Sequence, residues 1–336
     1  MNSKDEIVKV FDDEGGDAHP PAIFTQTGTV GQMDACGAEW PDANFEAEKM
    51  ARLALQAGRM FGFATVRIPF CITVDADAFG CGINPGSRSS HPSVTGFKFW
   101  KDGGASDVPT DLTSPEEFLE CPRVRTVLDA ASILSKEEDL FLVAGMNGPL
   151  ACINNLLGIR NVLATLLMEP DKVGAWLKAV TPRLIGYARA LSEATDCVMV
   201  IEEASTDLTP PECFDSVISP YLPWVIGGAQ KDSFCVTHSC GRTMEVAERL
   251  ASLGQDGISL EASSDPRAYL DLIGGRTLSL GAIEPVGTLL SKGPSEVVAE
   301  ARRSADMGFD FVTPECGVHP LTPDENLRAL ARYREL

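Results

Sequence analysis

The feature that most constrains the fold of this chain is a regular alternation between two kinds of segment. Short apolar runs, several of them rich in β-branched residues, alternate with longer stretches whose apolar residues recur at three- and four-residue spacing. Short runs of this kind form buried strands, and the longer spacing is that of an amphipathic helix. The alternation therefore predicts βαβ units and a parallel sheet.

Eight segments match the strand pattern, enough to close a barrel. They are residues 22–26, 64–69, 140–145, 197–201, 233–238, 257–261, 277–282 and 310–313. The clearest helical patterns cover residues 45–61, 173–193, 244–253, 295–307 and 326–336. Eight parallel strands with helices between them predict an α/β fold, the (β/α)₈ TIM barrel.

Two regions do not fit the repeat. Residues 1–21 are rich in acidic side chains and contain Gly15-Gly16 and Pro20-Pro21, so they are expected to form a mobile acidic tail ahead of a single barrel over 22–336. The stretch between the second and third predicted strands is too long for one connection. We therefore expect an insertion around residues 71–139, near the barrel mouth.

Composition limits the possible partners and the compartment. The formal net charge is −20, which disfavours binding to nucleic acid or to an anionic membrane. No apolar run is long enough for a membrane span, and the first twenty residues lack the apolar core of a signal peptide. A cytoplasmic protein is expected. Its ten cysteines should be reduced, and so serve as core residues, ligands or nucleophiles.

The strongest local signal is VTHSCG, in which His238 and Cys240 lie two residues apart at the end of a predicted strand. Such residues share one face of a strand. Cys316, in TPECGVHPLTP, follows the last predicted strand, and in a barrel all these strand ends meet at the active-site face. One imidazole and two thiolates suit Zn²⁺ with an open fourth position. Glu261, at the end of another predicted strand, is a candidate for that position.

A metal site has to be weighed against ordinary core packing. A buried cysteine is usually a small apolar side chain, and an HxC pair alone fits the core as well as it fits a metal. A second strand-end cysteine in a barrel pattern favours the metal. The cysteines interpreted as core or ordinary residues are Cys36, Cys71, Cys81, Cys121, Cys152, Cys197, Cys213 and Cys235.

Several motifs resemble one known family over nearly the whole chain after residue 20. They are TQTGTVGQMDACGAEWPDANFEAEKMARLAL, RIPFCITVDADAFGCGIN, ASTDLTPPECFDSVISPYL, THSCG and ECGVHPLTPDENL. The chain resembles the methylcobamide:coenzyme M methyltransferases, a zinc branch of the uroporphyrinogen decarboxylase superfamily. The resemblance implies zinc bound by His238, Cys240 and Cys316. It also implies an acidic residue, for which Glu261 is the candidate, that completes the zinc shell and gives way to the substrate.

The resemblance also implies a reaction and its partners. A small thiol such as coenzyme M would bind zinc as the thiolate and take a methyl group from a methylated corrinoid carried by a separate corrinoid protein. Arg67 and Arg242 lie at strand ends and could bind an anionic tail, although a surface or loop salt bridge is the favoured explanation for each. Glu315, and Ala282 after Gly281, depart from the family pattern near the mouth, which leaves the identity of the thiol open.

Two alternatives remain beside this interpretation. Gln56-Ala57-Gly58-Arg59 echoes a carboxylate-binding motif of the decarboxylases, but it lies within a predicted helix, and a decarboxylase has no need of the three metal-ligating residues. A non-catalytic metal or corrinoid carrier would keep the ligands without an open position. Turnover with a thiol would separate an enzyme from such a carrier.

Overall fold

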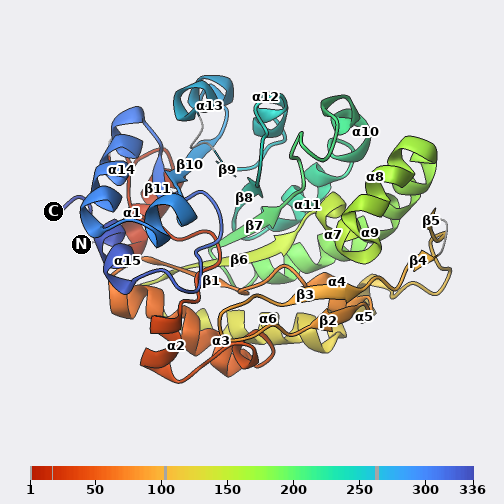
Figure 1. Ribbon diagram of the computed structural model, residues 1–336, viewed down its shortest axis with the longest axis horizontal. Helices are drawn as coiled ribbons and strands as arrows, with labels where there is room; N and C mark the ends of the chain where they lie inside the picture. The colour runs from red at the N-terminus through yellow and green to blue at the C-terminus, as the bar shows by residue number, and fades with distance from the viewer. Residues whose placement is uncertain (1, 17, 102–103, 262–264) are drawn as a thin grey trace.

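The computed structural model describes residues 2–16, 18–101, 104–261 and 265–336. At its centre lies a curled parallel sheet of seven strands in the order β1-β6-β7-β8-β9-β10-β11, with helices around it (Figure 1). The strands are β1 (Thr65–Ile68), β6 (Phe141–Asn147), β7 (Cys197–Ile201), β8 (Phe234–Ser239), β9 (Gly257–Leu260), β10 (Leu278–Ile283) and β11 (Phe311–Pro314). This is the predicted barrel-type α/β architecture.

The first of the eight predicted strands is wrong as a strand, although its residues fill the eighth position. The segment after Pro20 makes only an isolated bridge, in which the N–H groups of Ala22 and Val312 each reach a carbonyl of the opposite segment at 3.1 Å. On its other side, the Ile23 N–H donates to Thr65 Oγ1 of β1 at 2.6 Å. Pro20 and Pro21 lack N–H groups, so a full ladder cannot begin there. The segment bridges β11 and β1 without a ladder.

Helices surround the sheet and close the gaps between strands. Those joining or flanking the strands are α3 (Ala47–Ala54), α6 (Pro122–Leu134), α9 (Pro170–Ser192), α11 (Leu222–Ala229), α12 (Ala247–Ala251), α13 (Pro266–Ile273), α14 (Pro294–Met307) and α15 (Asp324–Ala331). The other helices are α2 (Val30–Cys36), α4 (Val74–Ala78), α5 (Pro115–Glu120), α7 (Pro149–Leu157), α8 (Ile159–Met168) and α10 (Phe214–Val217). Single turns are η1 (Asp42–Asn44), η2 (Ala57–Phe61), η3 (Pro211–Cys213) and η4 (Pro285–Leu290).

The sheet has two separate apolar faces because alternate residues of each strand point to opposite sides. One set packs against the surrounding helices, and the other fills the barrel interior with residues such as Phe24, Phe141, Val236 and Phe311. The interior set belongs to the first residues of the strands, so their last residues are free to carry polar side chains at the opposite end.

The N-terminal segment differs from the expected mobile tail. Residues 4–11 form α1 (Lys4–Phe11), with Ile7 and Val10 buried on one side of the helix. The ring of Phe11 stacks on Phe234 at 4.3 Å between centroids, against the first residues of the strands. The three- and four-residue spacing of these apolar side chains gave a helix that covers the barrel end opposite the mouth. Residues 1 and 17 of the predicted tail lie outside the described part.

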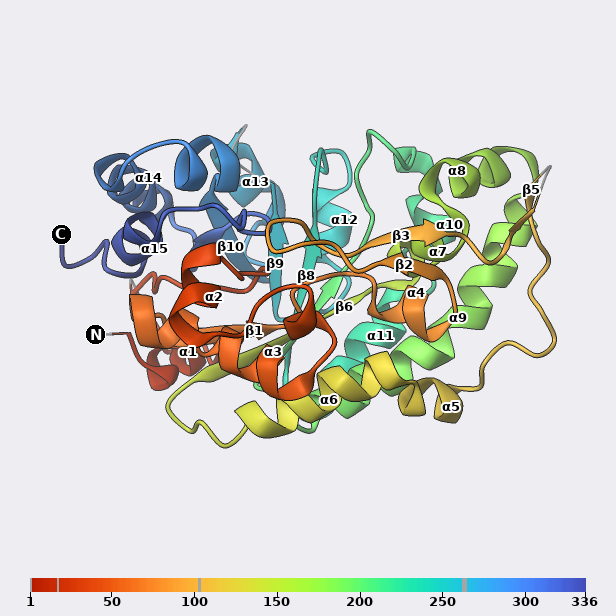
Figure 2. The ribbon, with the colours of Figure 1, turned by 60° about the horizontal axis from the view of Figure 1, so that its bottom comes forward.

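The long connection between β1 and β6 contains two small hairpins, β2 (Gly82–Asn84) with β3 (Ser93–Gly96) and β4 (Trp100–Lys101) with β5 (Gly104–Ala105). Figure 2 shows the β2–β3 hairpin along the side of the molecule near α4 and α7. Helix α6 returns to the sheet and packs on β1 and β6, so the additional structure occupies the first part of the predicted insertion. Residues 102–103 of this stretch lie outside the described part.

Candidate metal centre

Strand β8 aims His238 and Cys240 at one point. Val236 faces the barrel interior, and His238, two residues later, continues on that face at the carboxyl end of the strand. Gly241 follows with a φ of 72°, where a Cβ would lie only 2.6 Å from Ser205 Oγ. A glycine is therefore needed for the chain to turn away directly after Cys240.

Cys316 reaches the same point from the loop after β11. The loop is anchored on both sides, by the Glu315 N–H donating to the Ile283 carbonyl at 3.0 Å and the Val318 N–H donating to the Gln26 carbonyl at 2.9 Å. A Cβ on Gly317 would meet the Gln26 side chain at 2.8 Å. The loop therefore packs tightly against the segment that fills the eighth sheet position.

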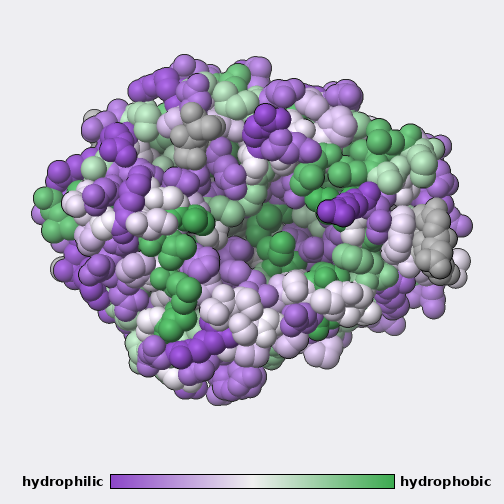
Figure 3. All heavy atoms as spheres, viewed as in Figure 1, coloured by the Kyte–Doolittle hydropathy of each residue, from purple (hydrophilic) through white to green (hydrophobic). Residues whose placement is uncertain are grey.

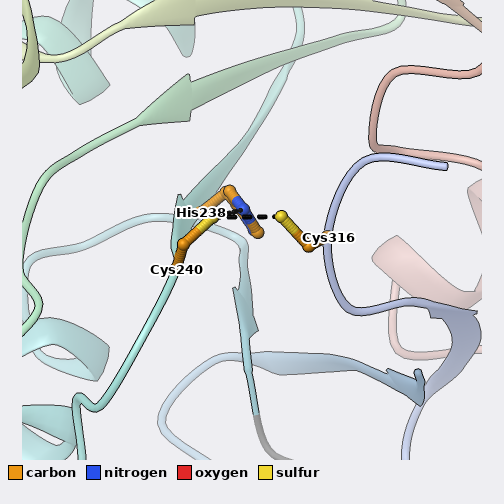
Figure 4. A group of neighbouring side chains, drawn as sticks. All are labelled: His238, Cys240 and Cys316. Carbon is orange, nitrogen blue, oxygen red and sulfur yellow. Dashed lines mark hydrogen bonds between the residues drawn. The ribbon is translucent and has the colours of Figure 1, made fainter. Parts of the chain in front are cut away.

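The three side chains converge closely (Figure 4). His238 Nε2 lies 3.0 Å from Cys240 Sγ, and Cys240 Sγ lies 3.2 Å from Cys316 Sγ. Their possible ligand atoms all lie within 4.8 Å of one another. The other ring nitrogen, His238 Nδ1, lies 3.0 Å from Ser259 Oγ of β9, a contact that orients Nε2 towards the sulfurs.

The donor set fits a zinc ion. Zn–S bonds of about 2.3 Å in a tetrahedron place the two sulfurs about 3.8 Å apart, so the pair would open only slightly to admit the ion. The contact between the two thiols also shifts their pKa values in opposite directions. A hydrogen bond from the Cys240 thiol lowers the pKa of Cys316, with help from His238, while the same contact raises the pKa of Cys240. The contact therefore favours ionisation of Cys316 over that of Cys240.

Glu261, the fourth predicted site residue, does not belong to this three-residue group. It is half-buried at the end of β9, and its charge raises the pKa values of both Cys240 and Glu203. Glu261 therefore lies outside the three-residue group but within electrostatic reach of Cys240 and Glu203.

Sequence reasoning missed Glu202 and Glu203, which follow β7 at the same barrel end. Glu202 is buried and accepts N–H donors from Leu150 and Ala151 at the start of α7, at 3.2 and 2.7 Å, yet burial still raises its pKa to about 7. Burial also raises the pKa of Glu203. The available signal was two carboxylates directly after a buried strand.

Cys240 opens onto a cavity of about 410 Å³. Its lining includes the apolar Ile72 and Phe97 and the polar Asn154, Asn155 and Glu203. Figure 3 shows this face of the molecule hollowed near its centre, with hydrophobic side chains exposed there. A second hollow, of about 420 Å³, lies beside Glu261. The cluster can therefore meet a substrate.

The three arginines noted in the sequence differ in their exposure and in their partners. Arg242 is 76% exposed and pairs with Asp207 at 2.8 Å, as expected of a surface salt bridge. Arg59, in the motif that echoes the decarboxylases, is also exposed and lies 3.7 Å from Glu137 in a turn before β1. Arg67 is buried at the end of β1 and donates to the Pro69 carbonyl.

Comparison with known proteins gives consistent matches over the full length. The uroporphyrinogen decarboxylase (URO-D) family model matches residues 2–335. A methylcobamide:CoM methyltransferase MtaA of Methanosarcina barkeri is 32% identical, covering 99% of this chain and 97% of the relative. A methylcobamide:CoM methyltransferase MtbA of Methanosarcina acetivorans is 30% identical, covering 97% and 96%.

Similar solved structures include two that bear on the fold. A methyltransferase from Methanosarcina mazei superposes with a TM-score of 0.90 at 32% identity, covering 100% of this chain and 99% of that one. A B12-independent methionine synthase from Shewanella sp. W3-18-1 gives a TM-score of 0.59 at 18% identity, covering 94% and 92%. The second likeness shows the barrel-type fold alone.

The electrostatics of the cluster predict selective alkylation of protein stripped of metal. At about pH 6, Cys316 should react with iodoacetamide roughly tenfold faster than Cys121, because its pKa is lowered whereas burial raises that of Cys121. Cys240→Ala removes the donated hydrogen bond and should slow the reaction at Cys316. Peptide mass spectrometry over time measures both rates. Equal rates at the two sites would contradict the proposed charge distribution.

Proposed function

The chain belongs to the uroporphyrinogen decarboxylase (URO-D) family and, within it, to the methylcobamide:CoM methyltransferases, and we propose that it transfers a methyl group from a methylated corrinoid to coenzyme M. The observation that carries the proposal is the convergence of His238, Cys240 and Cys316 within 4.8 Å beside a cavity. A thiol acceptor is chemically suited to such a site, because three ligands leave one position on a metal free.

We propose that zinc is the metal. His238 would bind through Nε2, because its Nδ1 faces Ser259, and both cysteines would bind as thiolates. Bound zinc would hold the substrate thiol as its thiolate, the form that attacks a methyl group. Two cysteine thiolates cancel the charge of the ion, so the substrate sulfur would keep much of its electron density. The protein's part is to fix the donors and the open side.

Glu261 is proposed to occupy the fourth position at rest and to leave it when the thiol arrives. The electrostatic effect of Glu261 on Cys240 supports this role, since it requires the carboxylate to lie near the cluster, and a carboxylate ligand is exchangeable. Glu203 lies on the same side of the cluster and lines the cavity. These carboxylates make that side a poor place for an anionic group, which limits how the thiol can lie.

The methyl donor is proposed to be a methylated corrinoid on a separate corrinoid protein. The cavity next to Cys240 opens to the surface, and its wall combines the apolar Ile72 and Phe97 with the amides of Asn154 and Asn155. A corrin ring also combines methyl groups with amide side chains, so its face could cover this opening. The reaction is expected to take place in the cytoplasm, and neither nucleic acid nor a membrane is expected as a partner.

The part of the chain that the structure describes has no single helix long and apolar enough to cross a membrane; α7 and α8 would suffice together, but a bend of 105° separates them.

Metal content provides the first test. Protein purified without chelator should contain about one zinc per chain, and Cys240→Ala and Cys316→Ala should each lose most of it. Cys121→Ala, a cysteine outside the cluster, should keep the metal. Glu261→Gln should keep most of it, because three stronger ligands remain. Elemental analysis measures all five proteins, and full zinc in both ligand variants would place the metal elsewhere.

Substitution of Ser259, which contacts His238 Nδ1, should weaken zinc binding without abolishing it. Ser259→Ala removes the partner of His238 Nδ1 and should weaken zinc binding about 10- to 100-fold, without removing a ligand. Competition with a chromophoric chelator measures the affinity.

Methyl transfer is tested directly with methylcob(III)alamin and coenzyme M under anoxic conditions. The zinc protein should produce the absorption spectrum of cob(I)alamin and methylated coenzyme M, while Cys316→Ala should be at least about 100-fold slower because the ligand set is broken. A decarboxylase or a non-catalytic carrier would give no cob(I)alamin. Absence of turnover with coenzyme M and with other small thiols would contradict the proposed function.

A further inference from the structure

Arg67 is an anomaly in the barrel interior. The residue is 2% exposed, and its only hydrogen bond within the described residues runs from Nη1 to the Pro69 carbonyl. Nε and Nη2 are buried without a partner, and no carboxylate of the described chain forms an ion pair with the guanidinium. A buried charge without a partner is costly, so it persists where something else compensates it.

A glycine on the neighbouring strand makes room for the Arg67 side chain. Arg67 lies beside β6, and a Cβ added to Gly145 of that strand would fall 1.9 Å from Arg67 Nη2. Any larger residue at position 145 would therefore displace the guanidinium. Burial lowers the pKa of Arg67 to about 10, which still leaves it charged at neutral pH. The strand pair thus holds a positive charge at a fixed position.

That charge lies on one side of the metal-ligand cluster. The guanidinium lies within electrostatic reach of Cys71, Tyr187 and Cys316, and the His91 ring lies within reach of Arg67, His319 and Cys316. His91 uses Nδ1 to donate to the Phe70 carbonyl at 2.9 Å. Nitrogen-bearing side chains therefore gather near Cys316.

The acidic side chains gather near the other sulfur. Glu203 lines the same cavity as Cys240, and Glu261 lines the second hollow together with Gly241, the residue after Cys240. An anionic group attached to a sulfur at the cluster is repelled from these carboxylates and attracted to the side of Arg67. The cluster therefore has a polarity that gives an anionic thiol a preferred orientation.

We infer that Arg67 is a specificity-determining residue, which supplies the positive charge that selects a thiol with an anionic end, such as a sulfonate. The inference rests on the proposed function and adds what that function leaves open, the residue that distinguishes coenzyme M from a neutral thiol of similar size. A guanidinium suits the task because its N–H groups can donate in pairs to a sulfonate or carboxylate. Arg242 has the opposite character, being exposed and already paired with Asp207.

The test compares two thiols on the same zinc-loaded proteins, coenzyme M and the neutral 2-mercaptoethanol. The measured quantity is the ratio of their kcat/KM values in the methylcob(III)alamin assay. Arg67→Met should lower this ratio about 10- to 100-fold, the usual effect of losing a charged hydrogen-bond donor. Gly145→Ala should lower it as well, because it displaces the guanidinium without removing it. Arg242→Gln should leave the ratio unchanged.

A binding measurement needs neither metal nor turnover. Ethanesulfonate, which carries the anionic end of coenzyme M without its thiol, should bind metal-stripped wild-type protein in calorimetry and should bind Arg67→Met at least about tenfold more weakly. Ethanol serves as the neutral control.

The outcomes separate the inference from the proposed function. If wild-type protein methylates neither thiol, the proposed function fails. If wild type methylates both and Arg67→Met slows both by the same factor, Arg67 balances charge or supports the fold without choosing the substrate, and the inference is overturned. A misfolded variant would also slow the reaction with both thiols. Arg67→Lys, which keeps the charge, is therefore the control: it should retain part of the kcat/KM ratio, and its ethanesulfonate binding is compared with that of Arg67→Met.

Discussion

The contact between Cys240 and Cys316 is the interaction on which the site depends. The two residues are 76 positions apart (316 minus 240), and their sulfurs lie 3.2 Å from each other because β8 and β11 end at the same face of the sheet. Parallel strands with helical crossovers impose this convergence. The rest of the local structure supports it: Gly241 turns the chain away from the site, and the loop of Cys316 is fixed against Gln26. With both sulfurs ionised, two thiolates this close would repel each other, and a bound divalent cation would relieve the repulsion.

The barrel separates a supporting end from a chemical end. At the first residues of the strands, the interior is apolar and α1 covers it, with Phe11 stacked on Phe234. At the last residues, His238 and Arg67 point into the same interior. A dry, packed base makes the local dielectric low, so that each charge at the mouth acts strongly on its neighbours. The carboxylates near Cys240 and the guanidinium near Cys316 would then orient a charged substrate before the reaction.

Much of the fold followed from the sequence because hydrophobic periodicity is local information. Seven of eight predicted strands pair in the sheet, and the eighth failed as a ladder because Pro20 and Pro21 remove N–H donors, which the apolar run at 22–26 does not reveal. The tail prediction overlooked the spacing of Ile7, Val10 and Phe11 within an acidic segment. The three metal-ligand candidates were identified from strand-end positions. Glu203 had only the signal of a carboxylate directly after a buried strand, and the environment of Arg67 required three-dimensional contacts, since burial without a partner has no sequence signature.

The central claim is that the cluster activates a thiol by binding it as the thiolate, and proton release tests this most directly. Coenzyme M added to zinc-loaded protein at about neutral pH, in weak buffer with an indicator dye, should release close to one proton per site, because metal ligation removes the thiol proton well below its own pKa of about 8.5. Metal-stripped protein should release almost none. Glu261→Gln should be titrated in parallel, since a displaced Glu261 could take up the proton. If coenzyme M releases protons from neither the zinc-loaded wild-type protein nor the zinc-loaded Glu261→Gln variant, thiol activation at this centre is contradicted, whatever the zinc content.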